Sequence, residues 1–190
     1  NIQTTFVTLH VGAGTFKPVT APIMQEHEMH AEWIEVSIDT LQFLRDNIDK
    51  NIVAVGTTSM RTIESLYWIG AKLLEQQAPD LSGIAVSQWD PYQVKSDVAA
   101  TSALQAVIDH LLLLKLTKLV TRTQILIAPG YTFKIAKGLV TNFHQPQSTL
   151  LLLVSALVGN AWRDIYDYAL QHDFRFLSYG DGCLLWNNNA

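Results

Sequence analysis

Short apolar runs alternate along this chain with longer stretches of helical periodicity, and this alternation narrows the folds that the chain can adopt. Ile52 to Val55 and Ile125 to Ala128 are two such runs, and they are typical of strands buried on both faces of a sheet. Polar or glycine-containing turns follow both runs. The pattern predicts an α/β fold with a mostly parallel, incomplete barrel-like sheet flanked by helices.

The remaining elements are predicted from β-prone residues and from apolar residues that recur every three to four positions. Further strands are expected at Thr4 to Val11, Ala31 to Ser37, Leu139 to Val140 and Phe174 to Tyr179. Helices are expected after a cap at Ser37 or Asp39, after Gly56 to Ser59, over Ala99 to Leu114, from Ser148, and from about Asn160 to Gln171. The stretch from Pro79 to Val94 is expected to be irregular.

The net charge and the charged fraction of the chain bear on whether it binds nucleic acid. Charged residues make up 16% of the chain, and the formal net charge is −4 at pH 7. Nucleic-acid binding normally needs a basic patch, and Lys115, Lys118 and Arg122 form only a modest one. The charge alone therefore argues against RNA binding. The low charged fraction fits a surface covered by further chain or a partner, and it equally fits a compact, core-rich domain.

Cysteine use and hydropathy predict a cytoplasmic protein that does not cross a membrane. Cys183 is the only cysteine, so an internal disulfide and a cysteine metal cluster are both excluded. The most apolar run, Leu150 to Val158, is far shorter than the ~20 residues of a membrane span. No signal peptide is visible. The chain opens at Asn1 in strand-like sequence rather than with Met, which we interpret as part of a longer protein.

Four polar clusters follow or end expected strands, which is where ligands bind in α/β folds. In the first, Gly12 and Gly14 allow close backbone approach to a ligand, and His10 is a candidate acid or base; a tight turn with a core histidine is the structural alternative. Another cluster runs from Gly56 to Arg61, at a helix N-terminus that favours anions. Helix capping and an Arg61–Glu64 pair are its structural alternatives.

The other two clusters are rich in histidine. His27, Glu28, His30 and Glu32 suggest metal ligation or proton transfer. Their spacing is not His-Glu-x-x-His, and metal ligation is less favoured than proton transfer or plain hydrogen bonding. The last cluster runs from Thr141 to Thr149. Within it Ser148 is expected to cap a helix, whereas the candidates for chemistry are Asn142 and His144.

Six motifs, taken in order, resemble the family of S-adenosylmethionine:tRNA ribosyltransferase-isomerases. They are Thr8 to Phe16, His27-x-Met29-His30-x-Glu32, Ala54 to Glu64, Pro129-Gly130, Thr141 to Leu150 and Arg175 to Asp181. The resemblance spans nearly the whole chain but only the C-terminal part of a family member. It implies that residues 1–190 are the C-terminal part of a larger catalytic domain, without the family's N-terminal section and small inserted β domain.

The resemblance implies an unusual reaction. S-adenosylmethionine, a substrate rather than a cofactor, gives its ribosyl group to 7-aminomethyl-7-deazaguanine at the tRNA wobble position. Isomerisation gives epoxyqueuosine-tRNA, and adenine and methionine leave. The expected partners are therefore S-adenosylmethionine, this modified tRNA and the missing N-terminal section. The 190-residue piece alone is expected to be inactive.

Residue roles follow from the resemblance and from chemical type. His10, His30 and His144 are the expected catalytic acids and bases. The turn from Gly56 to Arg61 would receive the methionine carboxylate, and Tyr179 or Phe143 would face the sulfonium or stack on a base. The expected substrate-binding residues are Gly12, Gly14, Glu32, Gly56, Thr57, Thr58, Arg61, Asn142, Phe143, Ser148, Tyr179 and Asp181.

Two other readings stay open from the sequence. One is a metal-dependent hydrolase or lyase that uses His27, His30 and Glu32, with His144 as a further ligand. The other is a non-catalytic fragment that binds tRNA or another protein chain.

Overall fold

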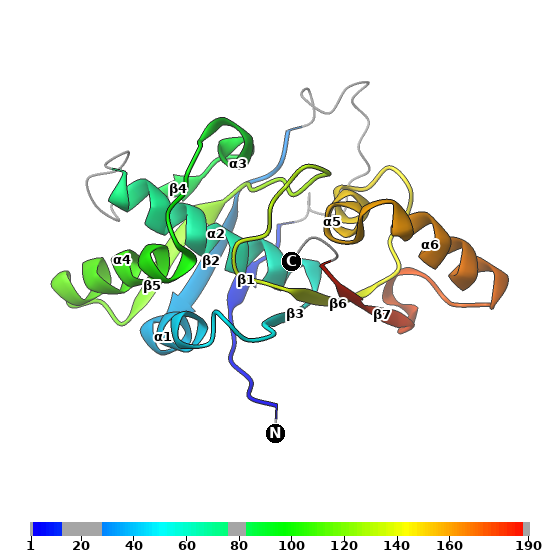
Figure 1. Ribbon diagram of the computed structural model, residues 1–190, viewed down its shortest axis with the longest axis horizontal. Helices are drawn as coiled ribbons and strands as arrows, with labels where there is room; N and C mark the ends of the chain where they lie inside the picture. The colour runs from blue at the N-terminus through cyan, green and yellow to red at the C-terminus, as the bar shows by residue number, and fades with distance from the viewer. Residues whose placement is uncertain (1, 13–27, 76–82, 188–190) are drawn as a thin grey trace.

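The computed structural model describes residues 2–12, 28–75 and 83–187, and its strands form two sheets (Figure 1). The first sheet has the order β1-β2-β5-β4 and the second the order β3-β6-β7. Their bounds are β1 Thr8–His10, β2 Glu32–Ser37, β3 Val53–Val55, β4 Ala85–Val86, β5 Lys118–Thr123, β6 Gly138–Asn142 and β7 Gly182–Trp186.

Both sheets are mixed, so the predicted α/β class is confirmed while the expectation of mostly parallel strands is wrong. β1 and β5 each run antiparallel to β2, and β4 runs parallel to β5. In the second sheet β3 and β6 are parallel, and β7 is antiparallel to β6. The described strands do not close into a barrel. Apolar runs misled the prediction because they report burial and not strand direction.

Three longer helices accompany the first sheet: α1 Ile38–Asp46, α2 Thr57–Leu74 and α4 Ala100–Leu113, with the short α3 Asp90–Gln93 nearby. α2 contacts α4 as well as strands of both sheets. α1 begins where predicted, because the Ser37 hydroxyl oxygen accepts the Thr40 N–H at 3.2 Å. Figure 1 shows α1 and α4 at the opposite end of the molecule from α6, with α2 running towards the centre.

The C-terminal helices lie beside the second sheet (Figure 1). They are α5 Thr149–Val158 and α6 Trp162–Gln171, and single 3₁₀ turns occur at Gly159–Ala161 and Leu177–Tyr179. The predicted cap at Ser148 is confirmed, since its hydroxyl oxygen accepts the Leu151 N–H at 3.2 Å. Buried side chains from both sheets and all the longer helices form one continuous core.

Some element predictions fail for identifiable reasons. Ile125 to Ala128 is buried as expected, except for the half-buried Ala128, but it is not a strand. The strand of that region is β5, in which exposed residues alternate with buried ones, two of them threonines, so that a search for apolar runs missed it. Phe174 to Tyr179 holds a 3₁₀ turn instead of a strand, and β7 follows it.

Within the described ranges, none of the helices combines the length and the hydropathy needed to cross a bilayer.

Candidate active site

A buried ion pair between Arg61 and Glu32 links the two sheets. It lies near strand ends that the predicted clusters follow. His10 ends β1 opposite Trp33 at the start of β2. Arg61, near the start of α2, donates from Nη1 to Oε2 of Glu32, the first residue of β2, at 2.6 Å. Because α2 follows β3 directly, this pair brings the carboxyl ends of β1 and β3 to one side of the molecule. The Gly56 N–H donates to the Val140 carbonyl at 2.8 Å, which adds the end of β6 to the same side.

The turn into α2 places backbone and not side chains at the helix start. Gly56 is the N-cap residue, at a φ of +92° that side chains disfavour, and no side chain caps the helix. The predicted capping by the hydroxyls of Thr57 to Ser59 is therefore wrong. The first-turn amides and the positive end of the helix dipole remain suited to an anion.

Arg61 and Glu32 are committed to each other. Their side chains are only 4% and 2% exposed, and Arg61 Nε also donates to the Ile125 carbonyl at 3.2 Å. Burial lowers the pKa of Arg61, and the adjacent Glu32 carboxylate opposes that shift. Nη2 of Arg61 has no hydrogen-bond partner among the described residues. The geometry makes the pair a structural link between the two sheets, with little of either side chain exposed.

Glu64 does not pair with Arg61, as the alternative for this cluster had suggested. Its fully buried carboxylate accepts the Tyr131 hydroxyl at 2.7 Å and the backbone N–H groups of Lys134, Ile135 and Ala136 at 2.8 to 3.0 Å. Burial raises its pKa, and these hydrogen bonds work against that rise. Glu64 thus fixes the segment that leads into β6, a role that the sequence did not reveal.

In the cluster that contains His30 and Glu32, two glutamines hold the backbone of Met29. The Met29 N–H donates to Gln88 Oε1, and Gln124 Nε2 donates to the Met29 carbonyl, both at 2.9 Å. These bonds do for the Met29 peptide groups what a neighbouring strand would do, and the next side chain, His30, stays exposed. His27 lies outside the described residues.

Metal ligation gains no support from this cluster. Glu32, one of the proposed ligands, is engaged by Arg61, and the described part of the chain gathers no group of three or more His, Cys, Asp or Glu side chains that could hold a metal ion.

His144 is held in a defined environment at the end of β6. Its side chain is 8% exposed, and its Nε2 lies 2.9 Å from Thr141 Oγ1. Its backbone N–H donates to the Tyr166 hydroxyl oxygen at 3.0 Å. Burial lowers the pKa of His144 to about 4, so the ring is neutral near pH 7. A neutral imidazole can accept a proton but is a poor proton donor.

The neighbours of His144 are more structural than predicted. Phe143 is buried, with its ring 5.2 to 5.6 Å from those of Tyr166, Phe174 and Phe176, so its expected contact with substrate is not supported by its position. The Ser148 hydroxyl caps α5 and donates to the Gln145 carbonyl at 2.8 Å. Asn142 is exposed and donates from Nδ2 to the Asp181 carbonyl at 3.4 Å.

The turn before β7, which Asn142 contacts through the Asp181 carbonyl, carries an exposed tyrosine. The Asp181 carboxylate accepts from the Arg175 backbone N–H at 2.6 Å and from its guanidinium at 2.9 and 3.1 Å. The side-chain hydrogen bond from Arg175 is the main reason that the pKa of Asp181 falls to about 2. Asp181 therefore shapes the turn, while Tyr179 is 74% exposed and available to stack on a ligand.

The first cluster lies on the open face of the first sheet. His10 and Gly12 are exposed, and Gly14 lies outside the described residues. His10, Trp33 and Arg122 stand opposite one another on β1, β2 and β5, with the Arg122 guanidinium 5.1 Å from the centre of the Trp33 ring. The motifs missed Trp33 and Arg122; the alternation of β2 and β5 was the signal that could have found their shared face.

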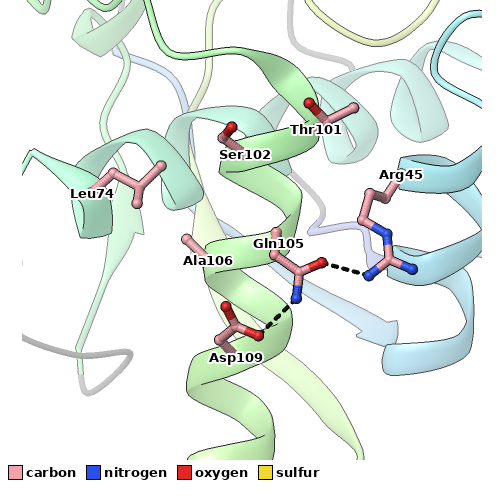
Figure 2. A pocket seen from close by; sticks show the side chains of 7 residues that line it. All are labelled: Arg45, Leu74, Thr101, Ser102, Gln105, Ala106 and Asp109. Carbon is pink, nitrogen blue, oxygen red and sulfur yellow. Dashed lines mark hydrogen bonds between the residues drawn. The ribbon is translucent and has the colours of Figure 1, made fainter.

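A surface hollow elsewhere is not this site. Figure 2 shows it between α1, α4 and the end of α2, where Arg45 Nη1 donates to Gln105 Oε1 and Gln105 Nε2 donates to Asp109 Oδ1. None of the predicted site residues lines it.

The described features define a mixed α/β protein in which the buried Arg61–Glu32 pair links the two sheets. The N-terminus of α2 and His144 follow β3 and β6, whereas His10 lies on the open face of the first sheet. Residues 1–185 match the family described as queuosine biosynthesis protein. The chain belongs to this family, which confirms the resemblance seen in its motifs.

Named relatives agree with this assignment. The chain is 38% identical over 187 residues to the S-adenosylmethionine:tRNA ribosyltransferase-isomerase of Herminiimonas arsenicoxydans, covering 97% of this chain and 42% of the relative. It is 39% identical over 188 residues to the protein of the same name in Methylocella silvestris, covering 97% and 40%. The chain thus spans about two fifths of the length of these relatives.

A solved structure is also similar. The crystal structure of S-adenosylmethionine tRNA ribosyltransferase from Thermotoga maritima matches with a TM-score of 0.51 and 29% identity, over 80% of this chain and 40% of that one.

Proposed function

We propose that this chain is the C-terminal part of an S-adenosylmethionine:tRNA ribosyltransferase-isomerase that makes epoxyqueuosine in tRNA. The observation that carries this proposal is the 38% identity to an enzyme of that name over 97% of the chain. The substrates are then S-adenosylmethionine and tRNA carrying 7-aminomethyl-7-deazaguanine, and the site of action is the cytoplasm.

The reaction needs groups that move protons in opposite directions. The sulfonium acidifies the neighbouring 5′ carbon, so a base must remove a proton there, and adenine leaves more readily when an acid protonates it. His144, at the end of β6, is the candidate base: it is unprotonated at neutral pH, but its pKa of about 4 makes it a weaker base than an exposed histidine, so substrate contacts would have to raise that pKa during catalysis. The exposed His10 and His30 are the candidates for the acid.

Substrate binding is proposed for the parts of the site that remain open. The first-turn amides of α2, from Thr57 and Thr58, suit the methionine carboxylate. Tyr179 suits stacking on a base or contact with the sulfonium. Arg61 and Glu32 support this arrangement from beneath, as the buried link between the two sheets.

A chimaera tests the function. The section of the Herminiimonas arsenicoxydans relative that this chain does not cover is fused ahead of residue 1, and adenine release from S-adenosylmethionine is measured with the modified tRNA. We expect release that requires the aminomethyl group, with tRNA lacking it as the control. No release from a folded chimaera, under conditions in which the intact relative is active, would refute the proposal.

A further inference from the structure

The outer face of the β3-β6-β7 sheet is apolar on all three strands. Val55, Val140 and Leu184 stand opposite one another across the sheet, and their exposed fractions are 71%, 37% and 53%. Val53, Gly138 and Trp186 form the next row. None of the outward positions on these strands carries a charge. Apolar groups this close together on a surface mark a contact site more often than scattered ones do.

Trp186 makes this face flat. A Cβ atom added to Gly138 would lie 3.0 Å from the Trp186 ring and 3.2 Å from Val53 Cγ2. The indole therefore lies across β6 towards Val53, and a larger residue at position 138 would have to displace it slightly. A flat apolar face favours packing against another layer of polypeptide over enclosure of a small ligand.

Helices cover the inner face of this sheet, whereas its outer face is exposed. On the inner face Ala54, Leu139 and Leu185 are buried in the core, and helices α2 and α5 contact these strands. β3 and β6 form a parallel pair, and sheets built mainly of parallel strands are usually covered on both faces. The outer face is thus one layer short of the usual arrangement.

We propose that this outer face is the docking surface for the section of polypeptide that the relatives carry and this chain does not. The inference rests on the proposed function, in which the chain works as part of a longer protein. The relatives contain enough further polypeptide to cover this face, because more than half of the Herminiimonas arsenicoxydans protein lies outside the match. The uncharged face favours polypeptide over RNA, whose binding would need cations here.

Thiol labelling tests the proposal. Val55→Cys places a probe on the face with little change in volume, and Leu170→Cys on α6, where Leu170 is 64% exposed, is the matched control; both are made in a Cys183→Ala background. The rate of maleimide labelling is measured in the chain alone and in the chimaera. We expect labelling at residue 55 to fall by at least about tenfold in the chimaera, because a covered thiol reacts only on local opening. The control should label equally in both proteins.

Two outcomes would overturn the proposal. Equal labelling at residue 55 in both proteins would show an uncovered face. Protection in the chain alone, together with a dimer by light scattering, would assign the face to a second copy. If the chimaera does not show a cooperative melt, the chain is instead co-expressed with the section that it lacks, taken separately from two relatives. Failure of both sections to co-purify with the chain would also count against docking. Because labelling needs no turnover, a protected but inactive chimaera would refute the proposed function alone.

Discussion

His144 is the residue whose surroundings say most about its chemistry. Its ring is buried beside Thr141, and its backbone is tied to Tyr166. We expect His144→Ala in the chimaera to lower turnover by about 10²–10⁴-fold, the usual contribution of an acid–base group, with a much smaller effect on stability. Steady-state adenine release beside a thermal melt measures both. Normal turnover in this variant would remove His144 from catalysis.

The same burial predicts a pH dependence of stability. His144 titrates at about 4 when folded and near 6.5 when unfolded. Between these values the unfolded chain binds more protons at this side chain, so its contribution to stability is present above about pH 6.5 and is lost as pH falls towards about 4.

As pH falls through that window, the melting temperature of the wild type should therefore fall relative to that of His144→Gln. His172→Gln, which alters an exposed histidine at the end of α6, is the control. A difference that stays constant from pH 7 to pH 4.5 would contradict the prediction.

At the scale of elements, two glutamines hold the Met29 backbone in place of a strand. Gln88→Met removes the acceptor of the Met29 N–H, whereas Gln124→Met removes the donor to its carbonyl. We expect each change to cost about 1 kcal/mol of unfolding free energy. Amide exchange at Met29 should accelerate markedly only in Gln88→Met. Equal exchange rates in the two variants would show that Gln88 does not hold this amide.

α2 and α4 approach so closely that one glycine sets their packing. A Cβ atom on Gly70 would lie 2.0 Å from the Ala103 carbonyl oxygen. Gly70→Ala gains about 1 kcal/mol of helix propensity, but this overlap is with backbone, which cannot step aside as a flexible side chain can.

We therefore expect net destabilisation by Gly70→Ala, measured by urea unfolding. Gly12→Ala serves as the control, because nothing lies within 4 Å of its added Cβ. A more stable Gly70→Ala protein would show that the helices separate at little cost.

Local sequence signals predicted most helices and their caps. They could not predict which strands pair when those strands are far apart in the sequence. Ser37 and Ser148 were recognisable as helix caps because a cap depends on neighbouring residues. β5 was missed because its buried positions alternate with Lys118, Val120 and Arg122 on an open face. Its direction relative to β2 depends on tertiary pairing, which periodicity does not encode.

The site shows the same division. Sequence pointed to His144 and to the turn at Gly56, since both stand where strands end. It assigned Arg61 to substrate, because its partner Glu32 lies in a different motif and only folding brings the two together. The burial that depresses the pKa of His144 is likewise a property of the folded core.

For the molecule as a whole, we expect the isolated chain to be inactive. It has an apolar sheet face exposed on β3, β6 and β7, and it spans about two fifths of its relatives. A site assembled from two chain sections loses the positioning that is worth ~7–11 kcal/mol of barrier. Incubating the chain with S-adenosylmethionine and the modified tRNA should release no adenine. Turnover at a rate close to that of the chimaera would show that the rest of the protein is dispensable.

The parallel pairing of β3 with β6 has a consequence for the order in which the protein folds. Val53 pairs with Gly138, so α2, α4 and β5 are all synthesised before β3 can find its partner, and β7 comes later still. Closing so long a loop costs entropy that only the finished pair repays. The β2–β5 pairing closes a loop of similar length, because Ser37 pairs with Lys118. We therefore expect the amides of α2 and α4 to gain protection first in pulsed hydrogen exchange, and the strands of both sheets, including the end of β6 that precedes His144, to follow them.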